Sequence, residues 1–126
     1  DLDEAVRVGH RIAIMRDGSV VQIGTPEEIV VNPADDYVAD FVKGISRLKV
    51  VQAKTIMQPL DDYKKNFGEN IGNNERVYEN DILSKLIETS VSENKPIIVL
   101  NNERKEVGVI TQSDLLKAVV EGNDNE

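Results

Sequence analysis

Hydrophobic positions in the first third of the chain change from a strand-like to a helical spacing. Two apolar runs, at 11–15 and 19–24, flank the Asp-Gly dipeptide at 17–18, which is typical of tight hairpin turns. Residues 25–28, Thr-Pro-Glu-Glu, then combine a capping threonine, a proline suited to the first helical position and a capping-box glutamate. Apolar residues at i, i+3 and i+4 spacing predict a second helix over 34–44. We therefore expect a hairpin followed by two helices.

Strand-like and helical spacings return in the last third of the chain. Two β-branched runs, at 97–100 and 107–110, predict short strands, and Gly108 inside the second run indicates a close approach of another part of the chain. Apolar residues at helical spacing follow over 115–120. A helical face also precedes the first run, formed by Ile82, Leu83, Leu86, Ile87 and Val91. With a very short strand before that helix, the predicted order over 77–122 is β-α-β-β-α.

The rest of the chain carries weaker signals. Residues 1–9 show a weak helical pattern, residues 45–51 suggest a linker or strand, and the polar stretch 60–76 predicts a long loop. Gly122 provides a stop for the last helix. The composition, 40% hydrophobic and 4% aromatic, suits a small aliphatic core. We expect an α+β fold in four parts. Residues 1–44 form a hairpin with helices, and residues 45–76 form a linker with an entry segment. Residues 77–122 form a β-α-β-β-α core, and residues 123–126 form an acidic tail.

Charge and residue usage exclude several classes of function. The net charge is −8 and no basic block offsets it, so polymeric nucleic acid is not an expected partner. The chain has no cysteine to form a disulfide or a thiolate nucleophile, and its one histidine, His10, has no second histidine beside it, so no metal site is expected. No apolar run approaches the roughly 18 residues that span a bilayer. Without a signal peptide we expect a cytoplasmic location, and without an initiator methionine we expect a fragment.

Residues 1–44 resemble the closing stretch of ATP-binding-cassette (ABC) ATPases. Asp-Leu-Asp-Glu-Ala at 1–5 resembles the residues that follow the switch histidine of importer ATPases. Arg-Ile-Ala-Ile-Met-Arg-Asp-Gly-Ser-Val-Val-Gln-Ile-Gly-Thr-Pro-Glu-Glu-Ile at 11–29 resembles the last hairpin and helix of their nucleotide-binding domain. The resemblance departs at His10, where the family usually has aspartate, and the switch histidine itself would precede Asp1.

The motifs that handle phosphate in such ATPases are not in this sequence. It has no Gly-x-x-x-x-Gly-Lys-Ser/Thr loop (Walker A), no signature loop and no acidic, Mg²⁺-binding strand end (Walker B). We therefore assign no catalytic residue and expect no ATP hydrolysis by this chain. The resemblance implies that the parent protein is an ABC-type ATPase, which contacts a transporter permease at the inner face of the cell membrane.

Two later stretches resemble a CBS domain (cystathionine β-synthase type), a regulatory module that often binds adenosine nucleotides. Gly-Val-Ile-Thr-Gln-Ser-Asp-Leu-Leu at 108–116 is similar to its closing half, and Ala-Lys-Thr-Ile-Met at 53–57 is similar to the segment that precedes its first strand. With an ATPase stretch of this type joined to a CBS stretch, the chain resembles the ATP-binding subunit of glycine betaine/proline/choline importers. The resemblance implies a regulatory segment that senses ionic strength or an adenosine nucleotide.

Thr111 and Asp114 are the sharpest candidate site residues. The resemblance implies that they hold the ribose and phosphate of a regulatory nucleotide, such as AMP, ATP or cyclic di-AMP. The chemistry fits, because a carboxylate can accept hydrogen bonds from two vicinal ribose hydroxyls and a helix N-terminus favours phosphate. Thr-x-x-Asp before an apolar run is equally a capping box. The two interpretations are compatible, and the sequence leaves both open.

Further candidates have a structural interpretation that we favour. Ile97, Ile98 and Val99 can supply an apolar slot for adenine, but core packing explains such a run at least as well. Scattered basic residues can meet phosphates, although a solvated face is the favoured interpretation; they are Lys54, Arg76, Arg104 and Lys105.

The sequence contains one β-α-β-β-α repeat, and a unit of about 60 residues is marginally stable alone. CBS repeats normally work in pairs, so we expect a homodimer with a symmetric interface. The expected contacts, each of which can equally be intrachain core, are Leu83, Leu86, Leu116 and Val120. Two alternatives stay open, namely a nucleotide sensor of another ABC importer and a dimerisation module without a ligand.

Overall fold

The computed structural model of the chain describes residues 10–69, 72–92 and 94–121. The chain divides into two compact units, Asp1–Val51 and Gln52–Glu126, which we call the N-terminal and the C-terminal unit. Each unit is described by itself below.

Three predictions fall outside the described residues. They are the weak helical pattern at 1–9, the helix stop at Gly122 and the acidic tail at 123–126. Within the described part of the chain, no helix is both long enough and apolar enough to cross a membrane.

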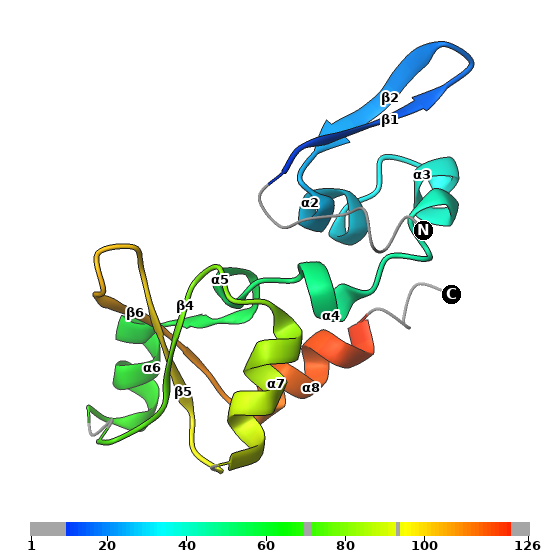
Figure 1. Ribbon diagram of the computed structural model, residues 1–126. Coiled ribbons are helices and arrows are strands. Elements are labelled where there is room, and N and C mark those ends of the chain that lie inside the picture. Colours follow the sequence, from blue (N-terminus) through cyan, green and yellow to red (C-terminus); the bar gives the residue numbers. More distant parts are fainter. Residues whose placement is uncertain (1–9, 70–71, 93, 122–126) are drawn as a thin grey trace. The chain divides into compact units, whose positions relative to one another are not determined.

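A β-hairpin opens the described part of the N-terminal unit, as predicted (Figure 1). Strand β1 (Ile12–Arg16) pairs antiparallel with β2 (Ser19–Gly24). The two turn residues, Asp17 and Gly18, have φ values of 51° and 82°. Positive φ at both positions is what a two-residue hairpin turn with the correct twist requires, and this explains the Asp-Gly dipeptide.

Helix α2 (Pro26–Val31) begins with the predicted capping box. Thr25 Oγ1 accepts a hydrogen bond from the backbone N–H of Glu28 at 3.2 Å, and Glu28 Oε2 accepts one from the Thr25 N–H at 3.1 Å. Helix α3 (Asp36–Phe41) follows, with Asp35 as its N-cap. This helix begins two residues after the predicted position, because the capping carboxylate belongs to Asp35.

The segment between α2 and α3 is tied to the hairpin by one side chain. Gln22 Oε1 accepts a hydrogen bond from the Ala34 N–H at 2.8 Å, and Gln22 Nε2 donates to the carbonyl of Asn32 at 3.1 Å. The hairpin and the helices are thereby held together around a small apolar core, whose buried members include Ile14, Ile29, Val38 and Val42.

The prediction of a linker or strand over 45–51 is corrected, because a helical turn, α4 (Arg47–Val50), forms there. Ser46 initiates it, with its Oγ accepting a hydrogen bond from the Leu48 N–H at 3.2 Å. The capping serine was present in the sequence, but four residues are too few for a helical periodicity to be recognised.

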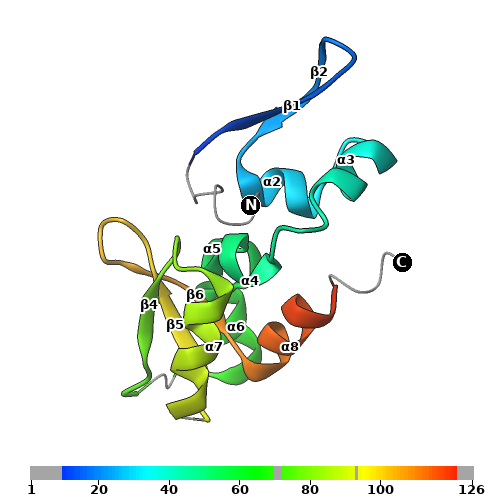
Figure 2. The same ribbon diagram turned by 45° about the vertical axis from the view of Figure 1, so that its right-hand side comes forward.

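The C-terminal unit contains the predicted β-α-β-β-α order (Figures 1 and 2). The elements are β4 (Arg76–Tyr78), α7 (Leu83–Ser92), β5 (Ile97–Leu100), β6 (Glu106–Ile110) and α8 (Gln112–Glu121). Together with β3 (Gln58–Pro59), the strands form a four-stranded sheet in the order β3-β6-β5-β4. The β4–β5 pair is parallel and the other pairs are antiparallel, so the expected α+β class is confirmed.

The long loop predicted over 60–76 is wrong in its first half. After the short helix α5 (Ala53–Ile56) and strand β3, the chain forms α6 (Leu60–Phe67). Leu60 is buried against Ile98 and Val109, with Tyr63 packed beside them. The composition of this helix is polar, so its narrow apolar stripe was not recognised in the sequence. The segment becomes helical because this stripe packs on the neighbouring sheet.

The sheet of the C-terminal unit is covered on both faces. Helix α6 lies on one side, and α7 and α8 lie side by side on the other (Figures 1 and 2). Because successive strand residues point to opposite faces, Ile98 and Val109 face α6 while Ile97, Val99 and Ile110 point to the other side. The apolar run of β5 is therefore continuous because both of its faces are buried.

Candidate functional site

Thr111 and Asp114 lie where β6 leads into α8. The two residues form a reciprocal capping box. The Asp114 N–H donates to Thr111 Oγ1 at 3.1 Å, and the Thr111 N–H donates to Asp114 Oδ2 at 2.9 Å. The capping interpretation is thereby confirmed in the geometry, and a nucleotide-binding role stays a prediction that is compatible with it.

A third side chain, which the sequence analysis did not select, completes this cluster. Gln58 Nε2 donates to Asp114 Oδ2 at 2.9 Å, across 56 residues of sequence. A carboxylate only accepts hydrogen bonds, so the amide NH₂ group of Gln58 must be the side that faces it. No local pattern marks Gln58, because its partner is defined by the pairing of β3 with β6.

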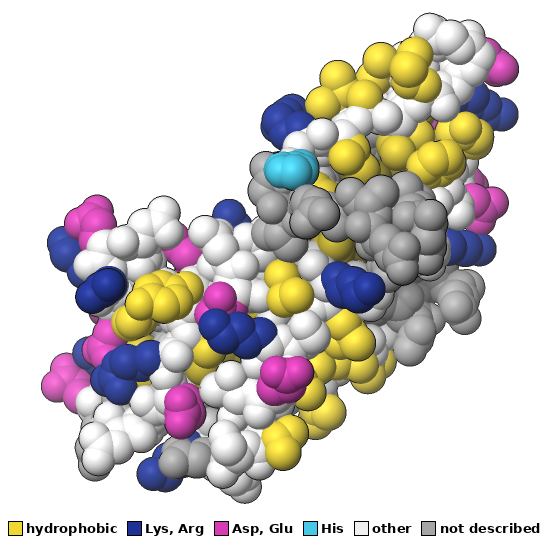
Figure 3. Space-filling model, in the orientation of Figure 1, with side chains coloured by type: hydrophobic (Ala, Val, Ile, Leu, Met, Phe, Trp, Pro, Cys, Tyr) yellow, Lys and Arg dark blue, Asp and Glu magenta, His cyan; other side chains and the backbone are white. Residues whose placement is uncertain are grey.

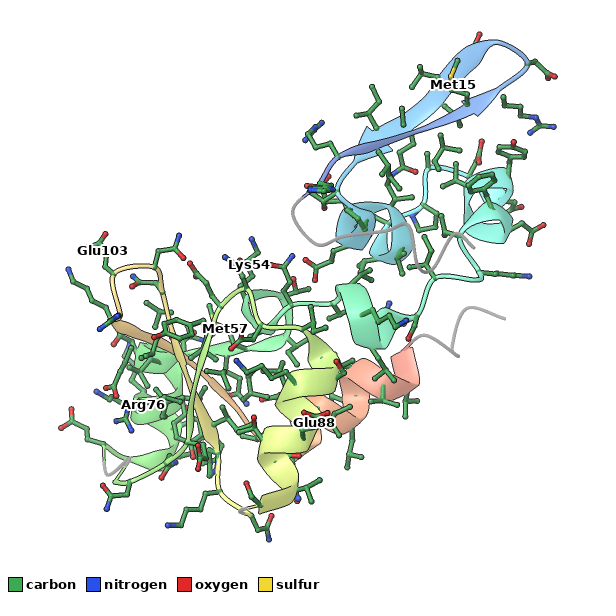
Figure 4. The ribbon with its side chains drawn as sticks, in the orientation of Figure 1. Met15, Lys54, Met57, Arg76, Glu88 and Glu103 are labelled. Atoms are coloured by element: carbon green, nitrogen blue, oxygen red, sulfur yellow. The ribbon has the colours of Figure 1, made fainter. Side chains whose placement is uncertain are left out.

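The predicted close approach at Gly108 is confirmed, and Met57 is the group that approaches. A methyl group added at Gly108 would meet Met57 Cβ at 3.0 Å, with Met57 Cγ and Sδ closer still. We call residues 52–59 the opening segment. Within it, Met57 (labelled in Figure 4) lies against β6, and Gln58 reaches the start of α8. Three separate stretches of sequence meet at this place.

Ile97, Ile98 and Val99 are all buried, at 2%, 0% and 0% exposure. They occupy β5, an inner strand with β6 on one side and β4 on the other. This arrangement matches the core-packing interpretation, and in it none of the three side chains is presented to solvent. Their part in an adenine slot stays a prediction.

The basic residues considered as phosphate ligands do not gather at one place. Arg76 binds Glu106 Oε2 through Nη2 at 2.6 Å and Nε at 3.0 Å, and Lys105 lies 3.6 Å from a Glu103 oxygen. Lys54 and Arg76 lie apart in the unit (Figure 4), and Lys54 and Arg104 are exposed. Basic and acidic side chains intermingle over the C-terminal unit (Figure 3), as expected for a solvated face.

Among the described residues, no group of three or more histidine, cysteine, aspartate or glutamate side chains is placed to hold a metal ion. His10 is exposed at the start of the described chain.

Comparison with known proteins found relatives among curated sequences only. No protein-family model and no solved structure matches the chain. It is 37% identical to the glycine betaine transport ATP-binding protein OpuAA of Bacillus subtilis over 118 residues, which are 94% of this chain and 25% of that protein. It is also 37% identical to the glycine betaine/carnitine transport ATP-binding protein GbuA of Listeria monocytogenes over 121 residues, which are 96% of this chain and 28% of that protein.

A shorter match has a higher identity. The glycine betaine/proline betaine transport system ATP-binding protein ProV of Escherichia coli is 59% identical over 56 residues, which are 44% of this chain and 14% of that protein. This chain thus spans about a quarter of the length of the first two relatives, and the matched part is their C-terminal part.

Proposed function

Because this chain is homologous to the C-terminal part of the ATP-binding proteins of glycine betaine and related osmoprotectant ABC transporters, we propose that it is the regulatory segment of such a protein. In this proposal the C-terminal unit is a CBS domain that senses an adenosine nucleotide or ionic strength. The complete protein is then an ABC ATPase that works with a permease at the cytoplasmic face of the membrane. The choice of transported osmoprotectant is determined by residues outside this chain.

The observation that carries the proposal is the position of Thr111 and Asp114. They stand at the N-terminus of a ten-residue helix, directly after a strand and beside the opening segment. In the described residues, both hydrogen bonds to the Asp114 carboxylate end on Oδ2, so Oδ1 keeps its lone pairs for a ribose hydroxyl. Backbone N–H groups in the first turn of α8 favour a phosphate.

The first test is calorimetry of the purified chain with AMP, ATP and cyclic di-AMP. We expect binding that Asp114→Ala weakens by about tenfold to a hundredfold, because a charged hydrogen-bond acceptor is lost. Asp35→Ala is the matched control, since Asp35 also caps a helix through its carboxylate but lies in the N-terminal unit. It should lower stability and leave affinity unchanged.

One outcome of this test would contradict a nucleotide-binding role of Asp114. If Asp114→Ala lowers the melting temperature as Asp35→Ala does and nucleotide affinity is unchanged, Asp114 acts as a helix cap alone.

A second candidate function, a dimerisation module without a ligand, is favoured by a different observation. Three apolar side chains of α8 are exposed, namely Leu116 at 67%, Val119 at 43% and Val120 at 50%. A second copy of the chain would cover them. A dimer that forms equally well with and without nucleotide, and that shows no nucleotide binding, would favour this candidate over the sensor.

A further inference from the structure

The opening segment is attached to the sheet by few backbone hydrogen bonds. Strand β3 has two residues and lies at the edge of the sheet, where Gln58 pairs with Val109 and Pro59 with Gly108. Pro59 has no N–H, so it cannot donate to the ladder. The start of the segment is held separately, since the Ala53 and Lys54 N–H groups donate to the carbonyls of Asp81 and Glu79, both at 2.9 Å. At residues 57–58, side-chain contacts carry much of the attachment, namely the Gln58–Asp114 hydrogen bond and the packing of Met57 on Gly108.

Both lone-pair sites of the oxygen that accepts the Gln58 hydrogen bond are already occupied. Asp114 Oδ2 accepts from the Thr111 N–H and from Gln58 Nε2, both at 2.9 Å. A carboxylate oxygen has two lone-pair sites, so a third donor can reach Oδ2 only by displacing one of these two. The Thr111 N–H belongs to the capping box and is fixed by the backbone. The amide of Gln58 sits at the end of a flexible side chain and is the group that can leave.

We propose that the Gln58–Asp114 hydrogen bond is a latch that a ligand with a vicinal diol opens. Two neighbouring hydroxyls that bind one carboxylate use both of its oxygens, and the hydroxyl that takes Oδ2 displaces Gln58. The opening segment then loses a contact that holds it to α8. Ligand binding therefore loosens residues 57–58, while the backbone hydrogen bonds of Ala53 and Lys54 keep the start of the segment in place. The ligand-driven opening rests on the proposed function, whereas the latch itself rests on the contacts above.

The latch distinguishes classes of nucleotide. AMP and ATP carry a free 2′,3′-diol and open it. A cyclic dinucleotide with 3′,5′ linkages, or 2′-deoxy-AMP, has one hydroxyl of the pair at most, and that hydroxyl can use Oδ1 with the latch closed. Regulation by the opening segment is therefore specific to ribonucleotides with a free diol.

The test compares the wild-type chain with Gln58→Met, which keeps the length of the side chain and removes the donor. Gln58→Glu is a second variant, whose carboxylate repels Asp114. Amide hydrogen exchange without ligand should be faster over 57–60 in both variants. By calorimetry, AMP should bind Gln58→Met about threefold to tenfold more tightly than the wild type, while affinity for 2′-deoxy-AMP stays the same.

The control is Glu106→Gln, which removes the ion pair with Arg76 on the same sheet and should change neither readout. Unchanged exchange over 57–60 in both Gln58 variants overturns the latch. Wild-type binding of AMP with unchanged or weaker binding by Gln58→Met overturns the competition and leaves the proposed function standing. If AMP binds neither protein, opening by AMP and AMP sensing in the proposed function both fail, and the exchange result still decides whether Gln58 holds the segment.

Discussion

Asp114 combines contacts that stabilise the fold with the proposed nucleotide-binding role. Its Oδ2 satisfies the Thr111 N–H, which the start of α8 would otherwise leave without a partner, and it also holds Gln58. Both contacts stabilise the fold without a ligand, and the hydrogen bond to the Thr111 N–H does so with a nucleotide bound as well. A change at Asp114 therefore affects stability in any case, and only an affinity measurement with a matched capping variant separates the two roles.

Gly108 is the residue whose substitution has the clearest steric consequence. We expect Gly108→Ala to lower the free energy of unfolding by about 1–3 kcal/mol, because the new methyl group overlaps the Met57 side chain down to its Cβ. Chemical denaturation of the full chain measures the change. Gly44→Ala is the matched control, since nothing lies within 4 Å of a methyl group added there.

A double variant identifies the cause of that loss. In a Met57→Ala background, Gly108→Ala should cost much less, because the overlapping group is gone. An equal cost in both backgrounds would contradict the steric explanation.

At the scale of elements, α6 is the helix whose formation depends most on its neighbours. Its sequence, Leu-Asp-Asp-Tyr-Lys-Lys-Asn-Phe, has three apolar positions among charged and polar ones. An isolated helix of this length is not stable in water. Burial of Leu60 against the sheet, together with the packing of Tyr63, supplies the missing stabilisation.

We therefore expect Leu60→Ala to be strongly destabilising, by about 2–5 kcal/mol, because it leaves a cavity against Ile98 and Val109. Urea denaturation followed by circular dichroism measures this loss. Lys65→Ala, on the exposed side of the same helix, should change stability by no more than about 0.5 kcal/mol. Similar effects of the two substitutions would mean that α6 does not pack on the sheet.

At the scale of the whole molecule, the dimer interface predicted from the sequence needs correction. Leu83 and Leu86 are fully buried inside the C-terminal unit, so they belong to its own core. Leu116 and Val120 are exposed, and Val119 on α8 and Val91 on α7 are exposed as well. The face available to a second copy is therefore narrower than predicted and centres on α8.

We predict a dimer at micromolar concentration that Leu116→Glu converts to a monomer, because a charge would then be buried in an apolar interface. Sedimentation velocity distinguishes the two states. Val20→Glu is the control, since Val20 is also exposed, at 52%, but lies in the hairpin of the N-terminal unit. A wild-type chain that stays monomeric with and without nucleotide would leave the interface on α8 without support.

Local signals in the sequence were sufficient for the turn at 17–18, for the capping boxes at Thr25 and Thr111, and for the β-α-β-β-α order. The turn and the capping boxes depend on residues within about four positions of each other, so their physical cause is contained in a short window of sequence. The order of the elements follows from the spacing of apolar residues within each element. The homology to osmoprotectant transport proteins likewise follows from sequence alone.

Only the tertiary structure decided which of the remaining residues meet. Helix α6 forms because a sheet face covers it, Met57 covers Gly108, and Gln58 reaches Asp114 across 56 residues. Each contact depends on the pairing of β3 with β6, which brings the opening segment to the start of α8. The sequence by itself determined the hairpin, the capping boxes and the β-α-β-β-α order, whereas the structure decided which distant residues meet, because contacts between distant residues are set by strand pairing and packing and leave no local pattern.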